Sequence, residues 1–268
     1  MKSARHQSLF LPLLGGAVAV AWVALLVWEG SPYGRYLNHG GWDERALLAS
    51  ICRALPAGEV VVPMLLYVGG WTLMTAAMML PSTFPLLEIF RRLVARRGDR
   101  AMLITLLVVG YLAVWSGFGI VAHLGDWLLY ELVIDHPWLQ LNGWLLGAGI
   151  ITVAGVFQFS SLKYRCLDKC RAPLGFVAQH WQGRRTRAQA FLLGAHHGLY
   201  CVGCCWALMG LMFVVGMGNV GWMLALGTVM AVEKNVAWGR RLAAPLGIVL
   251  IAWGILIVTT HTAMAISH

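Results

Sequence analysis

The run AFLLGAHHGLYCVGCCWALMGLMFV (190–214) contains no Asp, Glu, Lys or Arg, and its length suits a helix that crosses a lipid bilayer. About twenty apolar residues in a helix cross roughly 30 Å of hydrocarbon. Comparable apolar runs recur along the chain, so we expect an all-α fold: a polytopic membrane helix bundle of about seven transmembrane helices in a single domain, 1–268. The expected spans are 9–28, 63–87, 101–123, 141–162, 190–214, 219–234 and 242–260.

The composition agrees with a membrane protein and argues against a soluble domain. The 268 residues are 59% hydrophobic and only 12% charged, with a mean hydropathy of +0.72. Soluble domains carry about 25% charged residues. The net charge of +9 is therefore assigned to loops facing the cytoplasm, and the lipid bilayer rather than a nucleic acid is the expected partner.

Basic and non-basic loops alternate between the expected spans. Loops 88–100 and 163–189 are rich in Lys and Arg, whereas loop 124–140 contains neither. Because positively charged loops stay in the cytoplasm, this alternation predicts a cytoplasmic N-terminus and a C-terminus outside.

The run 190–214 also carries side chains that bind metals. At 100° per residue, His197, Cys201, Cys204 and Cys205 fall on one helical face, with His196 at its edge. A cysteine alone is a small apolar residue, but three with a histidine on one face favour metal or redox chemistry. A thiolate inside a membrane is costly unless a cation neutralises it.

Two further groups supply sulfur. In the span 63–87, Met74 and Met78 share a face, Met79 points elsewhere, and Pro81 predicts a kink just after the methionines. At the basic end of the span 141–162 lie two cysteines spaced i, i+4, Cys166 and Cys170. On the cytoplasmic side their thiols stay reduced, where they are available to exchange a metal with a carrier. Thiolate and thioether ligands favour Cu(I), while Cys with His also suits zinc.

Three stretches carry a family resemblance: AAMMLPS (76–82), QFSSLKYRCLDKCRAP (158–173) and HHGLYCVGCCWALMGLMFVVGMGN (196–219). Over about residues 64 to 238 the chain resembles the bacterial family called domain of unknown function 2182, predicted metal-binding integral membrane proteins of which some are labelled copper chaperones. The resemblance implies a multi-pass protein of the bacterial inner membrane. It also implies metal-binding roles for Met78, Met79, Cys166, Cys170, Cys201, Cys204, Cys205 and Glu233.

The favoured hypothesis is a copper-handling membrane protein that binds Cu(I) between the spans 63–87, 190–214 and 219–234. It would pass the ion to or from a metallochaperone or a membrane metalloenzyme. Two alternatives stay open: a membrane thiol redox enzyme using Cys201 and Cys204, and an accessory structural subunit of a larger membrane complex. Whether the protein catalyses a reaction or forms an oligomer also stays open. The candidate metal ligands are Met74, Met78, Met79, Cys166, Cys170, His196, His197, Cys201, Cys204, Cys205 and Glu233.

Overall fold

The computed structural model describes residues 2–29, 58–136, 138–139, 142–215 and 219–266, and within these ranges it contains helices and turns but no strand. The expected all-α class is therefore confirmed. The helices are α1 (Lys2–Glu29), α3 (Gly58–Met78), α4 (Phe84–Leu93), α5 (Arg100–Asp135), α7 (Trp144–Phe157), α8 (Ser161–Arg171), α9 (Pro173–His180), α10 (Thr186–Gly210), α11 (Met212–Val215), α12 (Val220–Asn235) and α13 (Ala243–Ile266), with 3₁₀ turns η3 (Pro81–Thr83) and η4 (Gly239–Leu242).

Three helical segments are long and apolar enough to cross a membrane: Arg100–Leu129, Thr186–Val214 and Gly239–Ala263. Two bent pairs raise this number to five if each pair forms one span. The pairs are Tyr67–Met78 with Pro81–Leu93, bent by 48°, and Trp144–Phe157 with Ser161–Arg171, bent by 62°. The described residues thus hold three to five candidate membrane spans, and the count of seven and the direction of the termini stay predictions.

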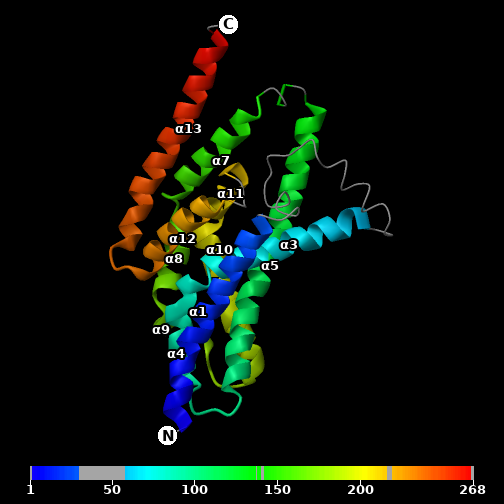
Figure 1. Cartoon of the computed structure of the whole chain (residues 1–268). Helices are drawn as coiled ribbons and strands as arrows, with labels where there is room; N and C mark the ends of the chain where they lie inside the picture. The colour runs from blue at the N-terminus through cyan, green and yellow to red at the C-terminus, as the bar shows by residue number, and fades with distance from the viewer. Residues whose placement is uncertain (1, 30–57, 137, 140–141, 216–218, 267–268) are drawn as a thin grey trace.

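Helices α5 and α10 pack closely against each other at the centre of the molecule (Figure 1). Glycines make this approach possible, because a Cβ added at Gly194 would collide with the Leu107 carbonyl and one at Gly110 with the Phe191 carbonyl. Small residues that let two helix backbones meet are typical of helix packing in membranes. Helix α8 packs against the same helix α10, and α13 runs beside α7 (Figure 1).

The predicted kink at Pro81 is present, and it reshapes the end of α3. The helix ends at Met78, and the chain continues through η3 into α4. The Ser82 hydroxyl donates to the Met79 carbonyl at 2.7 Å, and the Thr83 hydroxyl donates to the Leu80 carbonyl at 2.8 Å. The same two carbonyls also accept from the backbone amides of Ser82 and Thr83 at 3.1 Å, so the turn keeps its polar groups bonded inside the apolar core.

Candidate metal centre

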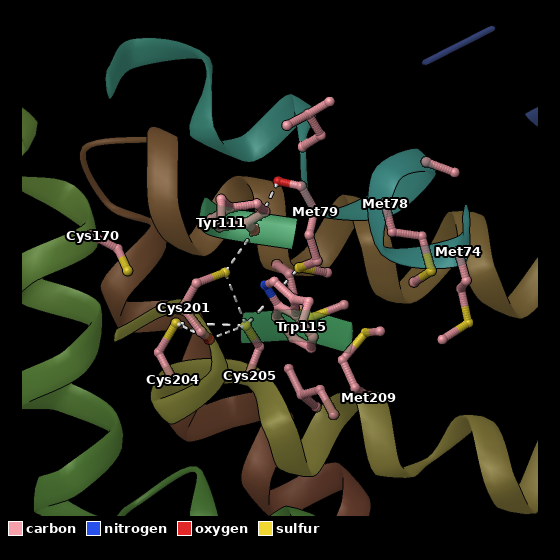
Figure 2. Packing of buried hydrophobic residues seen from close by; sticks show 14 of the residues in the cluster. Met74, Met78, Met79, Tyr111, Trp115, Cys170, Cys201, Cys204, Cys205 and Met209 are labelled. Carbon is pink, nitrogen blue, oxygen red and sulfur yellow. Dashed lines mark hydrogen bonds between the residues drawn. The ribbon is translucent and has the colours of Figure 1, made fainter. Parts of the chain in front are cut away.

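Four sulfur atoms meet in the buried core between α10 and the end of α3, in a group that we call the sulfur cluster: Met79, Cys201, Cys204 and Cys205 (Figure 2). The Cys205 sulfur is its hub. It lies 3.9 Å from the sulfur of Cys201, 3.6 Å from that of Cys204 and 4.0 Å from that of Met79. All four side chains are at least 98% buried, so the cluster is screened from water.

The predicted helical face is therefore confirmed as one buried face of α10. His197, Cys201, Cys204 and Cys205 are all buried, whereas His196 is exposed. The repeat of 3.6 residues per turn places these side chains on the side of α10 that faces α5 and α8.

Hydrogen bonds distinguish Cys201 from the other two thiols. The thiols of Cys204 and Cys205 both donate to the backbone carbonyl of Cys201, one turn earlier in α10. The Cys201 sulfur instead accepts a hydrogen bond from the ammonium of Lys234 at 2.9 Å, and it lies 3.0 Å from the Tyr111 hydroxyl. Cys201 thus has the surroundings of a thiolate, and the other two those of neutral thiols.

The ammonium of Lys234, near the end of α12, reaches into the sulfur cluster. Besides Cys201 it contacts the Met79 sulfur at 3.7 Å and the Ser82 hydroxyl at 3.3 Å. The residue is only 6% exposed. A buried cation needs a nearby negative charge, and the neighbouring carboxylate of Glu233 is bonded to Lys163 instead.

Glu233, which the family resemblance assigns to the metal, lies in a separate buried ion pair. Both of its carboxylate oxygens accept from the Lys163 ammonium at 2.8 Å. The same ammonium donates to the side-chain oxygen of Gln158, and all three side chains are at least 98% buried. This ion pair joins α8 to α12 and holds α12 so that the next residue, Lys234, faces the sulfurs.

The two cysteines of α8 lie next to the sulfur cluster. Cys170 and Cys204 are both buried, and their helices α8 and α10 pack against each other. The Cys166 sulfur packs against the backbone of α10 at Gly203, where an added Cβ would lie only 2.6 Å from it. The 62° bend before α8 turns this short helix toward α10, which brings the two sulfur groups together.

The remaining predicted residues occupy different places. Met74 and Met78 are buried on α3 beside the cluster, and Met79 is the methionine whose sulfur meets a cysteine thiol within the described chain (Figure 2). The His196 ring packs against that of His180, with centroids 5.1 Å apart, away from the cluster. The His197 ring lies between Tyr111 and Phe176, and its buried Nδ1 has no hydrogen-bond partner among the described residues.

Within the ranges that the structure describes, no three His, Cys, Asp or Glu side chains already converge as ligands of one metal ion. The described cysteines are also free, without a disulfide among them. What the site offers is a set of soft sulfur donors, one of them a thioether, around one buried ammonium.

Two residues of the site were missed from the sequence. Lys234 follows Glu233 at the end of an expected span, where a lysine ordinarily extends toward the membrane surface. Tyr111 lies in the middle of an apolar run, and only its hydroxyl distinguishes it from the surrounding core. A lysine and a tyrosine within otherwise apolar spans are costly unless partnered, which is the property that marks them.

The fold and the sulfur cluster together define a helical protein with several candidate membrane spans and a buried group of soft metal-binding side chains. Residues 68–257 match the PpoB2 family, described as copper chaperone. The match covers well over half of the chain, so the chain belongs to this family, and a copper-handling role is supported. Comparisons with curated proteins and with solved structures gave no significant match.

Proposed function

We propose that this chain binds Cu(I) through the sulfur atoms of Met79, Cys201 and Cys205. The observation that supports this proposal is the spacing of sulfur atoms around Cys205. Its sulfur lies 3.9 Å from the sulfur of Cys201 and 4.0 Å from that of Met79. With metal–sulfur bonds of about 2.3 Å, two sulfurs on one trigonal metal lie about 4.0 Å apart. Both separations from Cys205 match this value without a metal.

The donor types support copper in its monovalent state. Thiolate and thioether are soft ligands that select Cu(I), whereas zinc is bound by thiolate, imidazole and carboxylate rather than by a thioether. In the described core the carboxylate of Glu233 is held by Lys163, and the ring of the buried His197 packs between Tyr111 and Phe176. The family's description as copper chaperone agrees with this choice of metal.

We further propose that copper moves by ligand exchange through Cys204 and the pair Cys166 and Cys170. The Cys204 sulfur lies 3.6 Å from the Cys205 sulfur, and Cys170 is buried in α8, which packs against α10. Cys170 is 9% exposed, and its neighbour Lys169 lines a shallow pocket of about 150 Å³ between α8 and α9. Successive sulfurs within reach of one another allow a transfer in which one bond forms as another breaks.

The proposal also covers the membrane in which the protein lies and its orientation there. We propose a bacterial inner-membrane protein with seven spans, in which the basic segment that contains Cys166 and Cys170 faces the cytoplasm. The ion would then be exchanged there with a metallochaperone, or passed on to a membrane metalloenzyme. Copper in this scheme is cargo, and no catalysed reaction is required.

The test is a titration of the full-length protein with Cu(I), in lipid nanodiscs without oxygen, against a chromogenic chelator. Cys205→Ser should lower the Cu(I) affinity at least about 100-fold, because even residues that only support a metal ligand contribute 10- to 100-fold. Cys52→Ser is the matched control, since it makes the same substitution at a cysteine that is not among the proposed ligands, and it should bind like the wild type. Equal affinity and stoichiometry in Cys205→Ser would overturn the proposal.

Transfer is tested separately with the double variant Cys166→Ser/Cys170→Ser. The equilibrium affinity should stay close to that of the wild type, because Met79, Cys201 and Cys205 are intact. The rate at which a soluble chelator removes copper should fall. An unchanged rate would exclude the pair from the route while leaving the metal site untouched.

A further inference from the structure

We propose that Lys234 determines the charge of the metal ion that the sulfur cluster accepts: its buried ammonium balances a monovalent ion held by two thiolates and a thioether, and disfavours a divalent ion in the same place. This inference rests on the proposed function, since it concerns the same three sulfur ligands. It assigns to Lys234 the role of a specificity-determining residue.

The charge of the metal-free cluster is balanced within a few ångströms. The Lys234 ammonium lies 2.9 Å from the Cys201 sulfur, and Cys204 and Cys205 donate their thiol hydrogens to a carbonyl. One positive and one negative charge therefore face each other. The other contacts of the ammonium, with Met79 and Ser82, are neutral.

Binding of a metal changes this balance in a way that depends on the ion. A coordinating thiol is deprotonated, so Cys205 gives up one proton to solvent as the metal binds. Two thiolates, one Cu(I) and one ammonium then sum to zero. Two thiolates, one Zn(II) and one ammonium leave one positive charge in excess, in a core where unpaired charge is strongly disfavoured.

Without the ammonium the preference reverses. In Lys234→Met, two thiolates with Cu(I) leave one negative charge in excess, whereas two thiolates with Zn(II) are neutral. The buried ammonium of Lys163 is bonded to both oxygens of Glu233, so its charge is already balanced. A methionine has nearly the length of the lysine side chain and fills the same space.

The pair Lys163 and Glu233 explains why Lys234 stays where it is. Arg171 also donates to the backbone carbonyls of Glu233 and Val236, which holds the end of α12 against α8. Because α12 is fixed by its neighbours on both sides of Lys234, the ammonium lies at the sulfurs in the metal-free protein. The site is therefore set for a monovalent ion before any metal arrives.

The experiment compares affinities for Cu(I) and Zn(II) in the full-length protein, each against a chelator of known affinity. Removing one partner of a buried charge pair costs enough to change binding on the order of 30-fold or more. In Lys234→Met the ratio of Cu(I) to Zn(II) affinity should fall by at least that factor, and in Lys234→Arg, which keeps the charge, it should stay within a few-fold of the wild type. Arg184→Met is the matched control, because it removes an exposed positive charge in the segment before α10, and its ratio should not change.

The outcomes separate this inference from the proposed function. If both affinities fall equally in Lys234→Met, the lysine is only structural, and the inference is overturned while copper binding stands. An unchanged ratio overturns it as well. If Cys205→Ser binds Cu(I) like the wild type, the proposed site itself is wrong. Should Lys234→Met fail to fold, Lys234→Gln removes the same charge, keeps a polar contact for Ser82, and is judged by the same ratio.

Discussion

Glu233 and Lys234 are neighbours on α12, yet their side chains enter two buried regions that satisfy charge in different ways. Both carboxylate oxygens of Glu233 accept from the Lys163 ammonium at 2.8 Å, and the same ammonium donates to the side-chain oxygen of Gln158. Lys234 meets a thiol sulfur at 2.9 Å, a thioether and a hydroxyl. In the first region a carboxylate and an ammonium neutralise each other. In the second region an ammonium lies among polarisable sulfur atoms.

The difference shows which region is structural and which can bind a ligand. A carboxylate held by an ammonium through two oxygens leaves no strong site for another cation. Sulfur atoms 3.6–4.0 Å apart keep lone pairs that no hydrogen bond uses fully, and they match the distances within a metal site. We therefore expect that an unpaired charge in the first region destabilises the protein, and that loss of the sulfurs abolishes binding.

The largest effect is expected from breaking the ion pair on one side only. Lys163→Met leaves the Glu233 carboxylate buried without its cation, which should cost about 3–5 kcal/mol of the free energy of unfolding. The double variant Lys163→Met/Glu233→Leu removes both charges and should recover most of that loss. Thermal unfolding of the purified protein measures both.

The control for this prediction is an ion pair at the surface. Arg92 donates to Glu88 at 2.7 Å, but its side chain is 76% exposed, so Arg92→Gln should change the stability by less than about 1 kcal/mol. If Lys163→Met lowered the free energy of unfolding no more than Arg92→Gln does, the pair of Lys163 and Glu233 would not be needed for stability.

The second largest effect is stabilisation by copper, which should depend on the sulfurs and not on the ion pair. A ligand present at about 100 times its Kd adds about 2.7 kcal/mol to the free energy of unfolding. We expect this increment in the wild type and in Lys163→Met/Glu233→Leu, but not in Cys205→Ser. The melting temperature with and without Cu(I) measures it, and an increment that persists in Cys205→Ser would place the metal elsewhere.

Much of this comparison could be predicted from the sequence, because it depends on local periodicity. The all-α class, the kink at Pro81 and the common buried face of His197, Cys201, Cys204 and Cys205 all follow from residue type and helical spacing. A regular helix places side chains by their number alone, so these predictions needed no tertiary information.

The parts that could not be predicted depend on breaks in the helices. Helical spacing directs Met79 away from the face of Met74 and Met78, but α3 ends at Met78, and the next residue turns toward Cys205. The 62° bend that turns α8 toward α10 lies between α7 and α8, in an expected continuous span. Bend angles are set by packing between distant segments, which a single sequence does not display.

A smaller effect on Cu(I) affinity is expected from substitution of Tyr111. It tests whether Lys234 alone can stabilise the negative charge on the Cys201 sulfur. The Tyr111 hydroxyl lies 3.0 Å from the Cys201 sulfur and 3.5 Å from the backbone carbonyl of Met79. Tyr111→Phe should weaken Cu(I) binding about tenfold, the lower end of the range for residues that support a metal ligand, because Lys234 still contacts the same sulfur. Tyr200→Phe, a partly buried tyrosine of α10, is the matched control and should leave the affinity unchanged.

The smallest effect is expected at His196, and it decides between the two histidines that the sequence presents side by side. His196 is exposed and packs on His180, whereas His197 is 97% buried one turn before Cys201. His196→Ala should alter the free energy of unfolding by less than about 0.5 kcal/mol and leave Cu(I) affinity as in the wild type. His197→Ala should destabilise by about 2 kcal/mol or more, because it opens a cavity between Tyr111 and Phe176. A loss of copper binding in His196→Ala would show that the metal lies on the exposed side of α10, which the geometry of Cys205 argues against.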